Sequence, residues 1–260
     1  MGTILDEIVR WKRQEVAGRK LERPPEAVCA AAEQAPAPRD LEAALRAPGV
    51  SLIAEIKRAS PSRGLLCPTL DPPALAGLYE ANGAAAISVL TDAHYFGGAL
   101  EDLHAVRQEV ALPVLRKDFI LEPYQVYEAR AAGADALLLI VAALSDEELG
   151  GLHGLAQALG MAVLVEVHDE GELERARRVR PRIVGVNNRD LRTFRTDLET
   201  TARLRPLVGW ETALVSESGI HSAADVVRLA RMGVDAMLVG EALVCAADVG
   251  AKVQELVHAA

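Results

Sequence analysis

Five short polar strings, each directly after an apolar run, constrain the fold of this chain more than any other feature. The strings are Glu55–Ser62, Arg116–Phe119, Glu166–His168, Asn187–Asp190 and Ser216–Gly219. A buried strand followed at once by ionisable residues is typical of the carboxyl edge of a parallel sheet, where α/β proteins build their active sites. The pattern predicts one pocket assembled from many strand ends, which favours an enzyme over a binding module.

From residue 51 onward, apolar runs alternate with helical patterns. The predicted strands are Ser51–Ile56, Ala85–Leu90, Pro113–Leu115, Ala136–Val141, Ala162–Val165, Ile183–Val186, Thr212–Val215 and Ala236–Val239. The predicted helices are Pro72–Ala81, Leu100–Val110, Tyr124–Ala132, Asp146–Leu159, Glu170–Val179, Leu198–Leu204, Ser222–Met232 and Ala251–His258. This alternation predicts parallel βαβ units, and eight of them fit a closed (β/α)8 TIM barrel better than an open doubly wound sheet.

The first 50 residues precede the repeating pattern. Ile4–Ala17 has amphipathic helical spacing, Leu41–Leu45 predicts a second short helix, and a proline-rich segment lies between them. A segment of this length cannot form a core of its own. We therefore expect a single (β/α)8-barrel domain over residues 1–260, of which 1–50 form an N-terminal helical extension packed on the barrel.

The composition argues against several classes of function. The net charge of −9 disfavours non-specific binding to nucleic acid or to an anionic membrane, although a local cluster of lysine and arginine can still attract an anionic small molecule. Charged residues between Asp6 and Arg13 interrupt the apolar residues near the N-terminus. We therefore expect neither a signal peptide nor a membrane span.

Cysteine and histidine residues are scattered along the chain. Cys29, Cys67 and Cys245 are odd in number and match no metal-ligand spacing, and the histidines include no HExxH-type pair. Reduced thiols are typical of a cytoplasmic protein. We therefore expect a cytoplasmic protein that needs neither a metal nor another cofactor.

Glu55 and Lys57 end the first predicted strand and share the face of Ile53, because residues two apart in a strand point to the same side. In a barrel this face points inward, so the carboxylate and the ammonium group would lie together at its mouth. Paired charges in this layer are desolvated and usually serve function. A structural ion pair that closes the barrel end is the alternative.

Lys117 follows Leu115 on the inward face of the third predicted strand. A buried lysine with a depressed pKa can act as a general acid or bind an anion, whereas an exposed loop lysine is the alternative. Glu166, after the fifth strand, would complete an acid/base couple with Lys117. Asn187 could hold a hydroxyl or a carbonyl group, and Arg189 could bind a carboxylate or stabilise developing charge.

The last two predicted strands carry a different signal. Ser218 and Gly219 follow the seventh strand, and Gly240 and Glu241 follow the eighth. Backbone N–H groups at these strand ends form the common phosphate site of barrels, although both glycines can also serve only as tight turns. The residues alone thus predict a metal-independent barrel enzyme that acts on a phosphorylated small molecule, with lysine and glutamate as acid and base.

At these residues the chain resembles the indole-3-glycerol-phosphate synthase family of tryptophan biosynthesis, from about Asp40 to the C-terminus. An N-terminal extension is also typical of that family. The motifs that carry the resemblance, in the family's order, are Ile53–Ser62, Ser88–Asp92 with Phe96–Gly98, Leu115–Phe119, Val165–His168, Gly185–Leu191 and Glu217–Ile220.

The resemblance implies a carboxy-lyase that converts 1-(2-carboxyphenylamino)-1-deoxyribulose 5-phosphate to indole-3-glycerol phosphate by ring closure, decarboxylation and dehydration. It implies that Lys117 polarises the ketone as an acid and that Glu166 is its base or acid partner in the dehydration. Lys57 would hold the anthranilate carboxylate, which leaves as carbon dioxide, or donate a proton later.

Further contacts follow from the same resemblance. Glu55 and Asn187 would contact the sugar hydroxyls and position Lys57, Arg189 would order the site, and Glu217 would join the polar network. The remaining implied contacts are with the carboxylate (Ser60), the anthranilate ring (Phe96 and Phe119) and the phosphate (Ser218, Gly219 and Gly240).

Glu241 is a departure from the family pattern, because many members have serine at this position. A carboxylate beside a phosphate would repel it. We therefore expect the Glu241 side chain to point away from the phosphate, so that the residue offers at most its backbone N–H.

Two alternatives remain open at this point. Phosphoribosylanthranilate isomerase, a related barrel of the same pathway, would need a Cys/Asp acid–base pair at strand ends, where none of the cysteines is placed. A non-catalytic barrel that binds a phosphorylated metabolite would not need Glu55, Lys57, Lys117 and Glu166 together. The expected partner is the phosphorylated small molecule, and association with other tryptophan-pathway enzymes stays open.

Overall fold

The computed structural model describes residues 3–61, 63–190, 193 and 195–260. At its centre, parallel strands close into a barrel in the hydrogen-bonded order β1-β10-β9-β8-β7-β6-β5-β4. These strands are β1 (Ser51–Ile56), β4 (Ala86–Leu90), β5 (Val114–Lys117), β6 (Ala136–Ile140), β7 (Ala162–Val167), β8 (Ile183–Asn187), β9 (Ala213–Glu217) and β10 (Ala236–Val239). Ser62 and Leu191, which belong to two motifs quoted above, lie outside the described residues.

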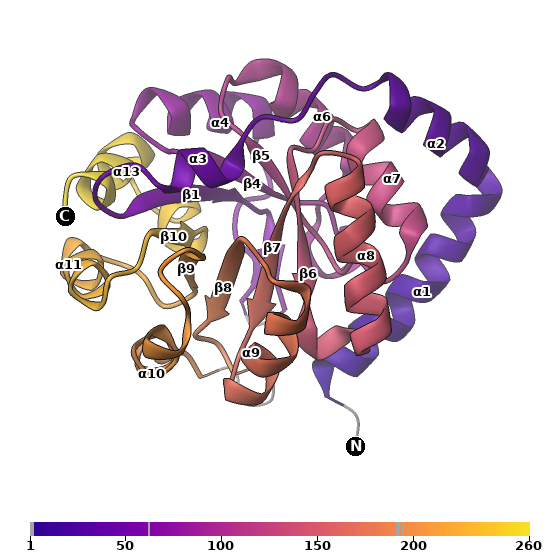
Figure 1. Cartoon of the computed structure of the whole chain (residues 1–260). Coiled ribbons are helices and arrows are strands. Elements are labelled where there is room, and N and C mark those ends of the chain that lie inside the picture. Colours follow the sequence, from indigo (N-terminus) through magenta and orange to yellow (C-terminus); the bar gives the residue numbers. More distant parts are fainter. Residues whose placement is uncertain (1–2, 62, 191–192, 194) are drawn as a thin grey trace.

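Helices alternate with these strands and surround the barrel (Figure 1). They are α4 (Pro72–Ala81), α6 (Leu100–Glu109), α7 (Pro123–Ala131), α8 (Asp146–Ala158), α9 (Glu170–Ala176), α10 (Glu199–Leu204), α11 (Ala223–Met232) and α13 (Val249–Val257). Short 3₁₀ segments, Val141–Ala143, Arg177–Val179 and Arg205–Leu207, precede α8 and continue α9 and α10. The architecture is a (β/α)8 TIM barrel, and the predicted fold class is confirmed.

Local sequence signals set the helix boundaries. The Asp71 side chain accepts a hydrogen bond from the Ala74 backbone N–H at the start of α4, and proline follows at the first helical position. Gly233 ends α11 with a φ of 76°, a left-handed conformation that side chains with a Cβ rarely adopt.

Two apolar layers hold the barrel together. Side chains such as Ile53, Leu115, Leu164 and Leu238 fill its interior. A larger buried layer lies between the strands and the surrounding helices. Both faces of each strand are therefore covered, which explains why the strands are continuous apolar runs rather than alternating ones.

The ends of β5 and β9 lie further along the chain than predicted. β5 ends at Lys117, which is paired with Leu90, and β9 ends at Glu217, which is paired with Asn187. Ladder pairing fixes the backbone of these residues. The predicted charged residues that lie within strands are Glu55, Lys117, Glu166 and Glu217. Lys57 and Arg189 follow the ends of β1 and β8, and Glu241 begins α12.

The N-terminal segment forms α1 (Ile4–Glu22), α2 (Pro25–Gln34) and α3 (Leu41–Leu45). Helix α1 is longer than predicted, and α2 was not predicted because its segment was read as proline-rich. Pro25 occupies the first turn of α2, where its missing N–H is not needed, and alanine favours the helix that follows. Val16, Val28 and Tyr124 join α1 and α2 to α7 in a small apolar cluster.

Smaller elements surround the carboxyl ends of the strands. They are a hairpin of β2 (Ala59–Ser60) and β3 (Gly64–Leu65), and the short helices α5 (Ala93–Phe96) and α12 (Glu241–Val244). Within the described residues, no helix has both the length and the apolar character needed to cross a membrane.

Candidate active site

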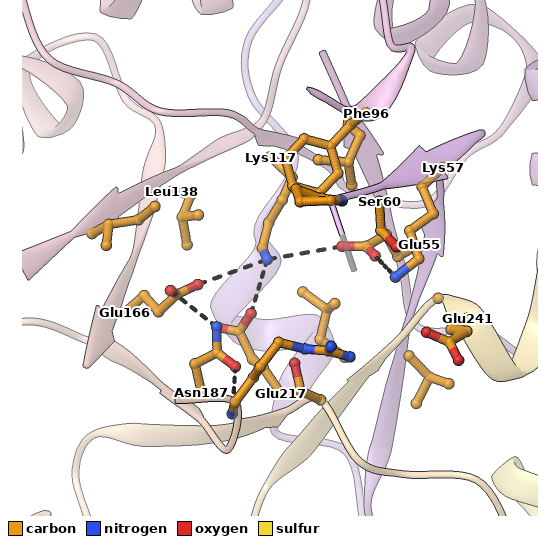
Figure 2. Close-up of a pocket in the computed structure, with 18 of the residues that line it drawn as sticks. Glu55, Lys57, Ser60, Phe96, Lys117, Leu138, Glu166, Asn187, Glu217 and Glu241 are labelled. Atoms are coloured by element: carbon orange, nitrogen blue, oxygen red, sulfur yellow. Dashed lines mark hydrogen bonds and ion pairs between the residues drawn. The ribbon is translucent and has the colours of Figure 1, made fainter. Parts of the chain in front are cut away.

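One cavity lies at the carboxyl ends of the strands. Every site residue predicted from the sequence lines it: Glu55, Lys57, Ser60, Phe96, Lys117, Phe119, Glu166, Asn187, Arg189, Glu217, Ser218, Gly219, Gly240 and Glu241. Figure 2 shows that Glu55, Glu166 and Glu217, which come from three different strands, converge on Lys117. This is the end of the barrel at which TIM-barrel enzymes carry out their chemistry.

Lys117 lies at the centre of this group. Its Nζ is 3.1 Å from Glu217 Oε2, 3.7 Å from Glu166 Oε2 and 3.8 Å from Glu55 Oε2 (Figure 2). Burial by itself would lower the pKa of Lys117, but the three carboxylates outweigh it and raise the pKa above its usual value. A depressed pKa, considered above for a buried lysine, is therefore wrong for Lys117, which carries its proton at neutral pH.

Glu217 is a carboxyl group placed to hold or release a proton near neutral pH. Burial raises its pKa to about 7; Lys117 opposes this increase, whereas Glu166 and Glu55 reinforce it. One ammonium group faces three carboxylates here, so the cluster is suited to exchange protons between its members.

Glu55 and Lys57 form the ion pair predicted from their shared strand face, with Oε1 and Nζ 3.0 Å apart. Glu55 is almost completely buried, which would raise its pKa, but Lys57 and Lys117 outweigh burial and lower it. The positive charge of Arg189 acts in the same direction. Glu55 thus lies between the two lysines and holds both of them in the cavity.

Asn187 connects two of the predicted residues. Its Nδ2 donates a hydrogen bond of 3.2 Å to Glu166 Oε1, and its Oδ1 accepts one of 3.1 Å from the Arg189 backbone N–H. One oxygen of Glu166 is therefore occupied, and the other faces Lys117 (Figure 2).

The predicted phosphate region combines unusual backbone conformations with a close approach. Ser218 and Gly219 have φ values of 68° and 81°, and the Asn188 side chain donates to the Ser218 carbonyl at 3.1 Å. A Cβ on Gly240 would lie 2.4 Å from Glu55 Oε1 and 3.0 Å from Lys57 Cε. Only glycine lets the end of β10 approach this ion pair so closely.

Glu241 lines the cavity, and its carboxylate forms an ion pair with Arg63. Glu241 Oε1 is 2.7 Å from Arg63 Nη2, in the segment that follows β1. This ion pair offsets the negative charge of Glu241 in the lining of the cavity.

Sequence reasoning missed one wall of the cavity. Ile4, Leu5 and Ile8 of α1 line it, close to the strand ends. Figure 1 shows the N-terminal end of α1 on the side of the molecule to which the strand arrows of β7 and β8 point. The amphipathic spacing of this segment indicated that one helix face is covered, but not which end of the barrel it covers.

The aromatic residues predicted to border a ring do lie together. Phe96 and Phe119 have ring centroids 6.2 Å apart, and both residues line the cavity. Among residues 3–61, 63–190, 193 and 195–260, no cluster of three or more His, Cys, Asp or Glu side chains is arranged to hold a metal ion.

The sequence profile of the family described as indole-3-glycerol phosphate synthase matches residues 5–256 of the chain. The chain belongs to this family. An indole-3-glycerol phosphate synthase of Roseiflexus sp. (strain RS-1) is 54% identical over 265 residues, which cover 98% of this chain and 98% of the relative. Another, of Parafrankia sp. (strain EAN1pec), is 53% identical and covers 98% of this chain and 95% of the relative. The resemblance found in the motifs is thereby confirmed.

Solved structures of other enzymes share the indole-3-glycerol phosphate synthase fold at low sequence identity. A 3-hexulose-6-phosphate synthase from Salmonella typhimurium superimposes with a TM-score of 0.65 at 14% identity, covering 81% of this chain and 98% of that chain. A thiamine phosphate pyrophosphorylase from Pyrococcus furiosus gives a TM-score of 0.61 at 17% identity, covering 84% and 96%. At such identity the likeness shows the fold alone.

Proposed function

We propose that the cavity converts 1-(2-carboxyphenylamino)-1-deoxyribulose 5-phosphate to indole-3-glycerol phosphate. The observation that carries this proposal is the position of Lys117, a protonated lysine within 3.8 Å of three buried carboxylates in a chain of this family. Such a cluster can donate a proton to the substrate and take one back, as a reaction that forms and breaks bonds at a ketone requires.

Ring closure is the first step. The aryl carbon that bears the carboxylate attacks the ketone carbon, and Lys117 donates its proton to the ketone oxygen, which becomes a hydroxyl group. The bond to the carboxylate then breaks, carbon dioxide leaves, and its bonding electron pair restores the aromatic ring. Lys57 would hold the carboxylate until this point.

Dehydration is the second step. The hydroxyl group leaves as water after it receives a further proton, and Glu166 accepts the proton from the neighbouring carbon that bears the nitrogen. The ketone oxygen gains two protons while the substrate loses one. The net reaction therefore takes up one proton from solvent in each turnover.

Binding uses the remainder of the cavity. Phe96 and Phe119 would flank the anthranilate ring, and Ser60 would contact its carboxylate. Glu55, Asn187, Arg189 and Glu217 would contact the sugar or order the lysines. The backbone N–H groups of Ser218, Gly219 and Gly240, with that of Glu241, would bind the phosphate.

The predictions about domain organisation, location, cofactors and partners rest on the sequence alone. A single domain over residues 1–260, a cytoplasmic location, independence from metals and cofactors, and the phosphorylated substrate as the partner remain predictions.

A continuous ultraviolet assay on the purified protein tests the proposed function directly. The protein is given the carboxyphenylamino-deoxyribulose phosphate in the presence of a metal chelator, and the indole chromophore is recorded. We expect indole to form. Binding without indole formation would contradict catalysis and favour a metabolite-binding barrel, whereas turnover of phosphoribosylanthranilate instead would favour the isomerase.

A further inference from the structure

His168 lies directly behind Glu166 and outside the set of residues that line the cavity. It follows β7, two residues after Glu166, so both side chains lie on the same side of this strand. His168 Nε2 is 3.4 Å from Glu166 Oε1, and the side chain is only 13% exposed. Among the described residues, no partner makes a well-oriented hydrogen bond to this buried Nε2.

The other ring nitrogen is firmly held. His168 Nδ1 is 2.9 Å from Glu172 Oε2, and the same oxygen accepts a hydrogen bond of 2.8 Å from the His168 backbone N–H. Glu172 belongs to the first turn of α9, where its own N–H donates to the N-cap Asp169 at 2.9 Å. The start of α9 therefore fixes the imidazole so that Nε2 faces Glu166.

We propose that His168 is a positioning residue, which as an imidazolium between Glu172 and Glu166 keeps Glu166 ionised and correctly oriented for proton abstraction. Asn187 holds the same Oε1 of Glu166 from the side of β8. With Oε1 held by these two groups, Oε2 is the oxygen left to face Lys117 and the substrate. This inference rests on the proposed function, in which Glu166 accepts a proton.

The charges around the imidazole favour its protonated form. Burial by itself would lower the pKa of His168, but the hydrogen bond to Glu172 and the charges of Glu166 and Glu217 outweigh it and raise the pKa to about 9. The carboxylates that face the ring come from β7, α9 and β9. Lys117 is the positive group that faces the other oxygen of Glu166, Oε2.

The test compares pH profiles of kcat and KM for the wild-type protein and His168→Gln. His168→Gln removes a positive charge that lies beside the Glu166 carboxylate. We expect kcat near neutral pH to fall at least about tenfold, KM to change little, and the acid limb of the kcat profile to move up by about one pH unit. Glu172→Gln should move the acid limb of the kcat profile in the same direction as His168→Gln, but by a smaller amount.

His153→Gln is the matched control. His153 is also a buried histidine, but it lies in α8 and its pKa is lowered by burial alone. This variant should keep the wild-type pH profile. A folded His168→Gln protein with an unchanged acid limb would overturn the proposal, and so would a loss of kcat that is equal at every pH.

A titration of the wild-type imidazole by nuclear magnetic resonance needs neither a variant nor turnover. We expect His168 to titrate near pH 9. Titration near the ordinary value of about 6.5 would overturn the proposal even if the variants fail to fold. Wild-type turnover tests the proposed function separately, so the two failures are distinguishable.

Discussion

Lys12 of α1 and Asp118, the residue after Lys117, form an ion pair of 2.9 Å in which both side chains are completely buried. Lys12 Nζ is also 2.7 Å from Asp92, whose side chain caps the short helix α5 that contains Phe96. One lysine of the N-terminal segment thus connects α1 to the strand that carries Lys117 and to an aromatic wall of the cavity.

We predict that Lys12→Met destabilises the protein by about 3–5 kcal/mol, because it leaves two buried aspartates without their shared cation. Lys20→Met is the matched control, since Lys20 also lies on α1 but forms a partly exposed pair of 2.7 Å with Glu122, the N-cap residue of α7. That pair contributes only about 0–1 kcal/mol. Denaturant unfolding measures both, and equal effects would show that the burial of Lys12 does not matter.

The stability that the Lys12–Asp118 ion pair contributes depends on pH. Burial would lower the pKa of Lys12, but Asp118 and Asp92 raise it; burial would raise the pKa of Asp118, but Arg116 and Lys12 depress it. The lysine contributes stability that is lost as pH rises above about 10, and the aspartate contributes stability that is lost as pH falls below about 4. The stability difference between wild type and Lys12→Met should be largest between these values and should shrink outside them.

Gly240→Ala tests the close approach of β10 to the Glu55–Lys57 ion pair. An added Cβ would lie 2.4 Å from the Glu55 carboxylate and would displace it. Overpacking of this kind costs about 1–3 kcal/mol, so we expect kcat/KM to fall about tenfold or more. Steady-state kinetics measure this loss.

Gly154→Ala is the control for Gly240→Ala. Gly154 lies in α8, and an added Cβ would meet nothing within 4 Å. This substitution should leave kcat/KM unchanged and stabilise the protein by about 0.5–1 kcal/mol. If Gly240→Ala also leaves kcat/KM unchanged, the close contact between Gly240 and the Glu55 carboxylate is not needed for activity.

Glu241→Gln and Arg63→Gln break the same ion pair but should change KM in opposite directions. Glu241→Gln removes a negative charge near the proposed phosphate site and frees Arg63, so we expect KM to fall by about two- to fivefold at low salt. Arg63→Gln leaves the carboxylate uncompensated and should raise KM. A change in the same direction for both variants would mean that the pair acts through loop structure rather than through charge.

The sequence predicted the barrel because its signal is periodic. Strands such as Ala136–Ile140 are buried throughout and stand between helices, so eight repeats of one strand–helix pattern indicate closure. The strand-end residues of the site were predictable for the same reason, because parallel strands bring their carboxyl ends to one edge.

The contacts made by the N-terminal segment could not be predicted in this way. Lys12 looks like an exposed lysine on an amphipathic helix, and its partners Asp92 and Asp118 are distant in the sequence. The pKa of Lys117 was also predicted in the wrong direction. Burial alone lowers the pKa of a lysine, but the three carboxylates that face Lys117 come from strands whose register the sequence does not give.

Lys117→Ala tests the central claim most directly, with turnover and substrate binding measured on the same sample. Removal of a positioned general acid should lower kcat by about 10²–10⁴-fold, while calorimetry shows binding close to that of wild type. Lys252→Ala, which removes a surface lysine paired with Glu255, should retain full activity. A folded Lys117→Ala protein that forms indole at a rate close to wild type would contradict the account.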